Sequence, residues 1–568
     1  MYIDVVPNRG SAPAALLRES YRDGKKIRKR TLANLSSLTS EQIEALRRVL
    51  RGEKVANASD VFEIVASRSH GDVQAVLTTM RRLGFEALLA ARPCRERQLV
   101  TSMVVARILA PQSKLATTRW WSSTTLPAEL GVEDATEDEL YDAMDWLLTK
   151  QDHIEQRLAA RHLDEGAIVL YDLTSTYFEG TTCPLAKLGY SRDGKLGKLQ
   201  VNFGLVTNGE GCPVGVSVHS GETADPKTLL PQLRRMRKVF GLLNLVLVGD
   251  RGMITQRQLD AVADDRDLDW ITALRSPAIQ RLRRDGVLQM GLFDERNLFE
   301  LSHPDYPGER LVACRNVALA KLRERKRTEL IAATQKDLDR IQTRVARGRL
   351  RTSAEIGIAV GRGINRYKVA KHFRLNIAEG SLTYEVRQER VAAEAALDGI
   401  YVIRTSVPKE NMSAEDAVRN YKRLSQVERA FRSLKTVDLH VRPIHHRLAN
   451  RVRAHIFLCM LAYYVQWHML RAWRSRLFAD EDDAAKRSRD PVAPAKRSRA
   501  ATKKAVEHTL PDGSVVHSFR TLLSNLATIV RNRCRRKDAS AAEATFELTT
   551  VPDDQQRRAF ELLEAIRV

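Results

Sequence analysis

The spacing of apolar positions changes along the chain from strand-like to helix-like and back. The opening residues contain two β-like runs, ALLRESYR and KKIRKRTLANL, joined by Asp23-Gly24. Because Asp-Gly suits the positive φ angles of a tight turn, residues 1–55 predict a basic β-hairpin region. Residues 56–164, which include GDVQAVLTTMRRLGFEALLA, repeat apolar positions at helical spacing. This stretch predicts a helical DNA-binding domain.

A strand pattern returns after Gly166. AIVLYDLTSTYFEG is an apolar strand, and LQVNFGLVTNGEGCPVGVSVHSGET predicts two more strands about the turn Asn208-Gly209. A helix beginning at Asp225-Pro226, the strand NLVLVGD, a second helix and the strand LDWITALRS follow. Three hairpin strands followed by helix, strand, helix and strand are typical of an RNase H-like α/β core. Residues 165–275 are therefore predicted to be its first part.

The predicted core is interrupted and then resumes. Residues 276–398 predict an inserted α+β domain, with an apolar stripe of Leu330, Leu338, Ile341 and Val345 along a long helix. Residues 399–470 predict the second part of the core, in which SAEDAVRNYKRLSQVERAFRSLKT forms one long catalytic helix capped by Ser413.

The C-terminal part has a different composition. AKRSRDPVAP and AKRSRAATKK form a repeat, which predicts a basic flexible linker over residues 471–510. Residues 511–568 predict a helical C-terminal region. The fold class expected is thus α/β: an RNase H-like catalytic core with an inserted α+β domain, a basic N-terminal DNA-binding region and a helical C-terminal region.

Net charge narrows the class of partner. The chain has 93 Lys and Arg against 70 Asp and Glu, a formal charge of +23, which calls for an anionic partner. Basic residues recur along the whole chain instead of lining one amphipathic helix, and the longest apolar run, from Ile456 to Val465, is far shorter than the roughly 20 residues that cross a bilayer. Nucleic acid is therefore the expected partner, with no membrane.

Cysteine usage and the N-terminus indicate the compartment. Six cysteines lie far apart without a C-x-x-C pair, which argues against a disulfide framework and a cysteine zinc site. The N-terminus has no basic stretch followed by an apolar run and a cleavage site. We therefore expect reduced thiols and a cytoplasmic location.

Three acids stand where the predicted fold would gather them. Asp172 lies in the first core strand, Asp250 closes a later strand, and Glu428 lies on the last core helix. Each has an ordinary explanation alone, as a cap, a turn residue or an i+4 partner of Arg432. Because the two strands are neighbours in this topology, we expect the carboxylates to meet. Oxygen-only ligation then predicts Mg²⁺ or Mn²⁺ held by Asp172, Asp250 and Glu428.

Basic and aromatic residues suit DNA near this site. Tyr421, Glu428 and Lys435 are spaced by 7 and 7, which places them on one helical face. His440, His445, His446 and His455 lack a zinc pattern, and a structural or phosphate-contact role is the better interpretation. The residues predicted to contact DNA are Tyr421, Arg423, Arg432 and Lys435 on the helix and Lys25, Lys26, Arg28, Lys29 and Arg30 on the hairpin.

These residues lie in stretches that resemble a family. YDLTSTYFEG, GDRGMIT, YKRLSQVERAFRSLKT and LHVRPIHHRLANRVRAHIFLCMLAYY resemble bacterial DDE-type insertion-sequence transposases, in the insertion-sequence family four superfamily with its tyrosine-arginine-glutamate-lysine signature. The resemblance implies that Asp172, Asp250 and Glu428 are the catalytic acids, and that Tyr421 and Lys435 are signature residues. Leu424 departs from it, because the signature has arginine there; Arg423 stands one place earlier.

The resemblance implies a nucleoid-associated transposase that binds terminal inverted repeats of double-stranded DNA as a synaptic homodimer. It would cleave with two metal ions and join the ends to target DNA, by cut-and-paste with hairpin ends. Two alternatives stay open: an RNase H-like nuclease without strand transfer, and a non-catalytic DNA-binding regulator. The presence of all three acids weighs against the regulator, and the large insertion and basic N-terminal region weigh against a simple nuclease.

Overall fold

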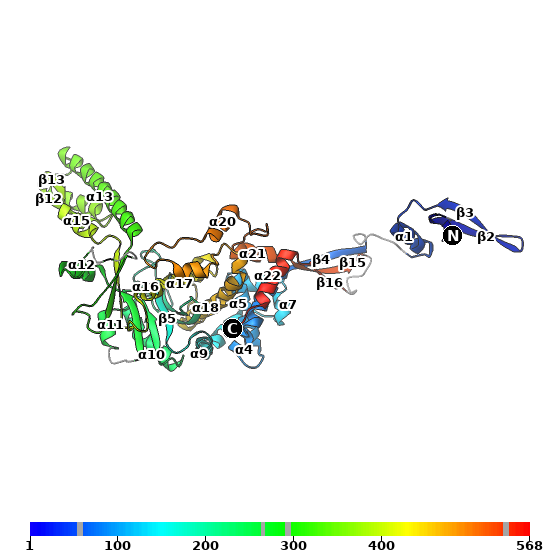
Figure 1. Cartoon of the computed structure of the whole chain (residues 1–568), viewed down its shortest axis with the longest axis horizontal. Helices are drawn as coiled ribbons and strands as arrows, with labels where there is room; N and C mark the ends of the chain where they lie inside the picture. Colours follow the sequence, from blue (N-terminus) through cyan, green and yellow to red (C-terminus); the bar gives the residue numbers. More distant parts are fainter. Residues whose placement is uncertain (9, 54–60, 263–266, 290–292, 294–296, 538–544) are drawn as a thin grey trace. The chain divides into compact units, whose positions relative to one another are not determined.

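The computed structural model describes residues 1–8, 10–53, 61–262, 267–289, 293, 297–537 and 545–568 (Figure 1). The chain divides into two units. The first contains residues 1–69 and 529–551, and the second contains residues 70–528 and 552–568.

An antiparallel sheet opens the first unit. Strands β1 (Tyr2–Asn8), β2 (Ser11–Asp23) and β3 (Lys26–Asn34) pair in the order β1-β2-β3, and Gly24 takes a φ of 61° in the turn between β2 and β3. The predicted hairpin is confirmed, and β1 adds a strand that the pattern did not indicate. Helix α1 (Ser40–Leu50) follows, capped by Thr39, whose side chain accepts a hydrogen bond from the Gln42 N–H.

A second sheet in this unit corrects two predictions. Strands β4 (Phe62–Ser69), β15 (Val530–Arg536) and β16 (Phe546–Thr549) pair in the order β16-β15-β4. Residues 56–164 are therefore not helical throughout, and residues 511–568 are not a purely helical region. The local pattern could not show this pairing, because β4 finds its partner strand almost at the other end of the sequence; Arg535 and Glu63, which form an ion pair across it, are 472 positions apart.

Helices begin the second unit, as predicted. Their apolar faces are buried; Val73, Val76, Val100 and Leu140, for example, are fully inaccessible. The helices are α3 (Gly71–Arg82), α4 (Phe85–Leu89), α5 (Arg95–Leu109), α6 (Lys114–Trp120), α7 (Leu126–Leu130), α8 (Glu137–Thr149) and α9 (Gln151–His162).

An eight-stranded mixed sheet forms the centre of this unit, in the order β10-β11-β14-β9-β8-β5-β6-β7. β5 pairs in parallel with β8, and β8 with β9, while the other pairs are antiparallel. The predicted succession of three hairpin strands, helix, strand, helix and strand is confirmed by β5 (Ala167–Tyr177), β6 (Gln200–Asn208), β7 (Pro213–Ser220), α10 (Pro226–Lys238), β8 (Leu245–Val248), α11 (Gln256–Asp260) and β9 (Leu268–Ala273).

The inserted segment is narrower than predicted. β10 (Leu298–Leu301) and β11 (Arg310–Arg315) fall within the predicted insertion but extend the main sheet, where β11 pairs with β14 (Ile400–Thr405). A β-like pattern predicts a strand but does not say which sheet it joins, which is why the boundary at 276 was misplaced. Helix α12 (Ser276–Arg284) also packs against this end of the sheet through Ile279 and Leu282.

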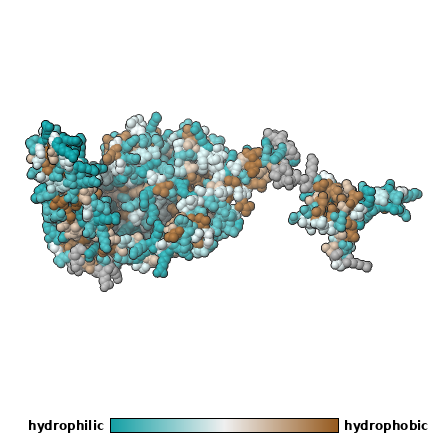
Figure 2. Space-filling model, turned by 90° about the horizontal axis from the view of Figure 1, so that it is seen from above, coloured by the Kyte–Doolittle hydropathy of each residue, from teal (hydrophilic) through white to brown (hydrophobic). Residues whose placement is uncertain are grey.

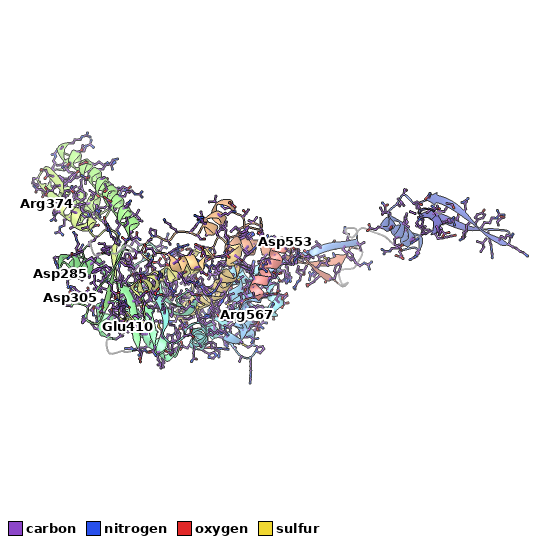
Figure 3. The ribbon with its side chains drawn as sticks, viewed as in Figure 1. Asp285, Asp305, Arg374, Glu410, Asp553 and Arg567 are labelled. Carbon is purple, nitrogen blue, oxygen red and sulfur yellow. The ribbon has the colours of Figure 1, made fainter. Side chains whose placement is uncertain are left out.

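A separate core holds the rest of the insertion together. It contains Leu338, Ile341 and Val345 of the predicted stripe, with Leu330 packed at its edge. Arg374, labelled in Figure 3, pairs across the small sheet with Glu385 at 2.6 Å. The elements are α13 (Val317–Ala346), α14 (Ser353–Ile364), β12 (Phe373–Ala378), β13 (Ser381–Val386) and α15 (Gln388–Ala395).

The predicted single helix after β14 is broken. α16 (Ala414–Lys422) is followed by its C-cap residue Arg423, α17 (Leu424–Arg432) comes next, and the last turn, Ser433–Val437, is π-helical. Ser413 caps α16 as predicted, by accepting from the Asp416 N–H. The run from Ile456 to Val465 lies in α18 (Ala449–Ala472) and is buried, as predicted. No helix among the described residues is long and apolar enough to cross a membrane.

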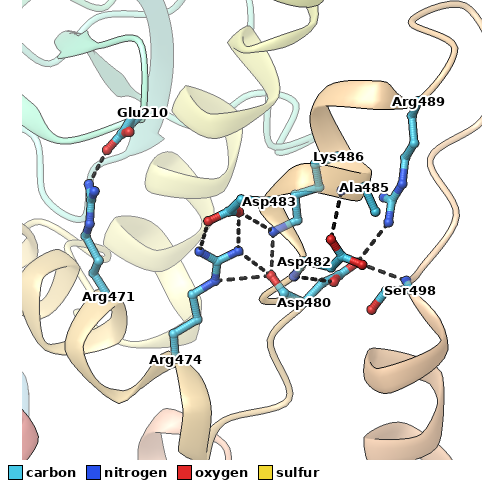
Figure 4. A network of polar contacts seen from close by, with 10 residues as sticks. All are labelled: Glu210, Arg471, Arg474, Asp480, Asp482, Asp483, Ala485, Lys486, Arg489 and Ser498. Atoms are coloured by element: carbon cyan, nitrogen blue, oxygen red, sulfur yellow. Dashed lines mark hydrogen bonds and ion pairs between the residues drawn. The ribbon is translucent and has the colours of Figure 1, made fainter.

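Residues 471–510 are not a flexible linker. They form a short 3₁₀ turn (Trp473–Arg476), α19 (Asp483–Ser488) and α20 (Arg499–Glu507). Figure 4 shows the ionic network that orders them: Arg474 pairs with Asp483 at 2.6 Å, and Asp480 accepts from Arg489 at 3.2 Å. The prediction was wrong because it weighed the basic repeat without the acidic run Asp480–Asp483 that neutralises it.

Polar surface dominates the visible face of the second unit in Figure 2, where the inserted segment at the left is mostly hydrophilic. The C-terminal helices α21 (Phe519–Leu526) and α22 (Asp554–Glu564) complete this unit. Trp473, fully buried, donates its indole N–H to the Ala559 carbonyl at 2.9 Å and so fixes α22 to the end of α18.

Candidate active site

The register of the main sheet brings two of the predicted acids together. β5 and β8 run parallel, and their last paired residues are Leu170 and Val248. Asp172 and Asp250 each lie two positions beyond that pair, so both stand at the carboxyl end of β8. This is the end at which open α/β sheets bind ligands. The predicted adjacency of the two strands is therefore confirmed.

Helix α17 presents the third acid. Val427, Ala430 and Phe431 are buried, and the ring of Phe431 meets Phe203 of β6 edge-on at 5.6 Å. These contacts hold α17 against the sheet and leave Glu428 on its exposed side.

The electrostatics of Asp172 connect the three acids. Its pKa is raised to about 7, first by burial and then by the charges of Asp250 and Glu428. The Leu173 N–H, which donates to Asp172 Oδ1 at 2.8 Å, and the charge of Arg192 oppose the rise. The carboxylates are thus close enough for their charges to repel, which a bound cation would relieve.

The donor set fits a hard divalent cation. All three side chains offer only oxygen, the ligand that Mg²⁺ and Mn²⁺ prefer. Their oxygens are not all within 4.8 Å of one another, however. Among the described residues that distance is met only by the ligand atoms of His162, Cys212 and His468.

This second cluster joins α9, the β6–β7 turn and α18. His162 Nε2 lies 3.0 Å from the Tyr464 hydroxyl, and the rings of His162 and His468 are 5.5 Å apart. Burial lowers the pKa of both histidines, to about 4 and about 3, and raises the pKa of Cys212. The sequence did not indicate the grouping, because its members are far apart along the chain.

Three residues of the helical segment, Tyr421, Glu428 and Lys435, lie toward β5 and the end of β8. The Tyr421 hydroxyl donates to Asp250 Oδ1 at 3.3 Å, and Lys435 Nζ donates to the Ser175 carbonyl of β5 at 2.9 Å. The charge of Glu428 raises the pKa of Asp172. Burial raises the pKa of Tyr421, as does the charge of Asp250, so the phenol remains a neutral donor.

Lys435 is less available to a ligand than predicted. It is buried, and its ammonium pairs with Asp193 Oδ1 at 2.9 Å. Arg442 pairs with the other oxygen of Asp193. Burial lowers the pKa of Lys435, while Asp193 counteracts this. Sequence reasoning missed Asp193, since one acid in the polar stretch SRDGKLGK carries no distinguishing pattern.

The arginines of the helix differ in position. Leu424 is buried in the core, so no arginine could point from there into solvent without repacking. Arg423 lies beside the β6–β7 turn, where a Cβ on Gly209 would come within 2.8 Å of its Nη1. Asn208 pairs with Val169, so this turn is about 10 Å along β5 from Asp172. Arg432 is exposed, with no ion-pair partner among the described residues.

The hairpin cations in the first unit are all exposed. Arg28 pairs with Asp23 at 2.9 Å, Arg30 pairs with Glu19 at 3.1 Å, and the Lys29 ammonium lies 5.7 Å from the centre of the Tyr2 ring. Lys25 and Lys26 form no ion pair with any residue that the structure describes. The turn therefore carries the least compensated positive charge of the hairpin.

Two acids at the carboxyl end of β8 and a third on α17 suit a divalent cation, and comparison with known families identifies the class of protein. Residues 165–465, more than half of the chain, match the family described as "Transposase DDE domain". The chain belongs to this family of DNA-cleaving and strand-transferring enzymes, whose DDE domains generally depend on Mg²⁺ or Mn²⁺.

A second family model and a solved structure are also similar to this chain. Residues 3–61 match "IS1634 family transposase, N-terminal domain". Among solved structures, the chain is similar to a piggyBac transposase in a cryo-EM synaptic complex with hairpin DNA, at 8% identity and a TM-score of 0.35, over 80% of this chain and 77% of that chain. No curated protein matches.

Proposed function

We propose that this protein is an insertion-sequence transposase of the family four superfamily, acting in the bacterial cytoplasm on terminal inverted repeats and target DNA. Asp172, Asp250 and Glu428 are its catalytic acids and metal ligands. The observation that carries the proposal is the register that places Asp172 beside Asp250, together with the effect of Glu428 on the pKa of Asp172.

Two divalent cations would be held by these acids. When bound, such ions activate the attacking oxygen and stabilise the leaving oxygen of an in-line phosphoryl displacement. The chain's own residues prepare the site. Tyr421 holds Asp250 through its hydroxyl, and the Leu173 N–H holds Asp172, so both carboxylates are oriented before DNA arrives.

Positive charge near Asp250 supports DNA binding there. A cavity of ≈ 390 Å³ lies between Arg251 and the inserted segment, and Arg323, Lys326 and Lys368 also line it. None of these four cations has an acidic partner among the described residues. Lys368 holds a φ of 56°, a strained value for a residue with a side chain. We infer that DNA beside the cleaved bond passes along this surface.

Strand transfer favours the transposase over the nuclease alternative. The hairpin cations, the inserted segment and the C-terminal network exceed what hydrolysis alone requires. We propose cut-and-paste transposition through hairpin ends in a synaptic homodimer, in which recognition of the ends lies mainly before residue 165. Joint molecules formed from element ends and target DNA test this function directly.

Tyr421→Phe tests whether the hydroxyl orients Asp250. We expect the cleavage rate on end DNA to fall about tenfold, because loss of one hydrogen bond to a charged group costs about 1.4 kcal/mol in the reaction. The ring keeps its packing, so the thermal unfolding temperature should hold. Tyr384→Phe on β13, which also removes a hydroxyl bonded to an aspartate, is the matched control. A rate for Tyr421→Phe equal to that of the control would show that the hydroxyl only packs.

Lys435→Met tests whether the Lys435 ammonium contributes to hairpin formation on the DNA ends. Because Lys435 neutralises buried Asp193, we expect both hairpin formation on pre-nicked ends and stability to fall. Undiminished hairpin yield in a folded Lys435→Met protein would remove Lys435 from the DNA-processing step.

A further inference from the structure

A second cavity, of ≈ 320 Å³, lies where the N-terminal helices meet the segment after the catalytic helix. Its wall contains Arg107 of α5, Lys114 of α6, Arg442 and several histidines, and no acidic residue lines it. The wall combines residues of the helical region with the stretch VRPIHH, of which Arg442 also pairs with Asp193 beside the catalytic site.

Lys114 is the unusual feature of this wall. It is 4% exposed, and its ammonium has no hydrogen-bond or ion-pair partner among the described residues. Burial and the nearby charge of Arg107 lower the pKa of Lys114 to about 7. Lysine is almost never buried without a partner, because removing an ammonium from water costs several kcal/mol. The folded chain therefore buries an amine whose charged form is disfavoured unless an anion binds beside it.

Arg107 adds a second nearly buried cation to the wall that contains Lys114. Arg107 is 6% exposed and donates one hydrogen bond, to the Gln112 carbonyl at 3.3 Å. Burial lowers the pKa of His446 to about 3 and keeps His455 neutral as well, so the positive charge of this wall comes from its lysine and arginines. His455 Nε2 lies 3.0 Å from the Val441 carbonyl, so this nitrogen carries the proton of the neutral ring, and the buried Nδ1 is an acceptor that does not bind an anion. Two basic side chains, Arg107 and Lys114, thus share one cavity that no acidic residue lines.

The cavity continues toward the catalytic site. His440 and Arg442 also line a neighbouring cavity of ≈ 270 Å³, whose wall includes Lys435 and Asp193. Lys435 and Arg442, which both pair with Asp193, therefore connect the two cavities, while Arg107 and Lys114 have no acidic partner among the described residues. A strand of DNA carries one phosphate per nucleotide, so a strand bound at the acids would present further phosphates along such a path.

We propose that the cavity formed by Arg107, Lys114 and His446 binds a backbone phosphate of the DNA, one or more nucleotides from the phosphate that is cleaved. The proposal rests on the proposed function for its ligand. An inorganic phosphate ion offers the same oxygens, but the continuity with the Lys435 cavity favours a phosphodiester in a strand. An ion pair between the Lys114 ammonium and this phosphate would offset the free energy that burial of the ammonium costs in the free protein.

Lys114→Met separates this role from a structural one, since the two predict opposite changes. In the free full-length protein we expect the unfolding temperature to rise or hold, because an uncompensated buried charge is removed. For duplex DNA in EDTA, affinity at about 0.1 M salt should fall about tenfold, and the slope of log K against log salt should decrease by about 1. Lys114→Arg should keep the wild-type slope, and Lys238→Met removes an exposed lysine as the control.

Three outcomes would overturn the proposal. One is an unchanged salt slope in Lys114→Met. Another is a decrease no larger than that of Lys238→Met. The third combines two results: inorganic phosphate stabilises the wild type but not Lys114→Met, and the two proteins have the same salt slope of DNA binding. The cavity would then bind a free anion and not a phosphate of DNA. Binding in EDTA does not depend on catalysis. A protein that fails to cleave end DNA would therefore refute the proposed function, while the effect of Lys114→Met on DNA binding could still be measured.

Discussion

Exchange of any one of Asp172, Asp250 and Glu428 for its amide will abolish cleavage of the element's end DNA while leaving DNA binding intact. Each amide keeps the shape of the side chain and removes a negative charge that would hold a divalent cation. We expect a loss on the order of 10³-fold or more, because metal stabilisation of the transition state supplies several kcal/mol and each 1.36 kcal/mol is tenfold in rate.

Matched variants make that expectation specific. Glu410→Gln, on the exposed loop before α16 and labelled in Figure 3, controls for Glu428→Gln, and Asp260→Asn at the end of α11 controls for the two aspartates. Cleavage is measured with Mg²⁺ and with Mn²⁺ on DNA that flanks the gene. Full activity in any one of the three variants would exclude that residue from the catalytic set.

Replacing the five hairpin cations by glutamine will weaken binding of end DNA on the order of 10²-fold at about 0.1 M salt. The change removes Lys25, Lys26, Arg28, Lys29 and Arg30 together. The slope of log K against log salt should decrease by about 3 and not by 5. Arg28 and Arg30 already pair with Asp23 and Glu19, so they neutralise DNA phosphates less than the three lysines do.

This experiment requires the full chain. A fragment of residues 1–165 would lack β15, the strand with which β4 pairs, and would expose a sheet edge. A control protein with glutamine at Arg487, Lys496, Arg497, Arg499 and Lys503 loses the same number of exposed charges from the C-terminal segment. Equal loss in both proteins would mean that the hairpin contributes only general charge.

The strands that carry Asp172 and Asp250 could be predicted because their signals are local. An acid inside an apolar strand, as at Asp172, and an acid that closes one, as at Asp250, are visible in short stretches of sequence. The order of strands and helices then predicts that the two meet, and the register of β5 with β8 confirms it. Glu428 followed from the position of its helix after the next core strand.

The remaining features depend on contacts between distant segments. β4 pairs with β15, which no local period reveals, and β11 joins the main sheet although it lies inside the predicted insertion. Lys114 follows Ser113 at the start of a helix, where a lysine is normally exposed; only the packing of α6 shows that it is buried. The basic repeat near residue 490 was misread because the acids before it were not counted against it.

The proposed function requires that the three acids form one site that cuts and rejoins DNA. It is tested most directly by incubating the wild-type protein with labelled end DNA and a target plasmid, with Mg²⁺ or with EDTA, and measuring covalent end–target joint molecules. We predict joint molecules only with the divalent cation, and none with Glu428→Gln. Cleaved ends without joint molecules would favour the nuclease alternative, and products formed in EDTA or by Glu428→Gln would contradict the assignment of the site.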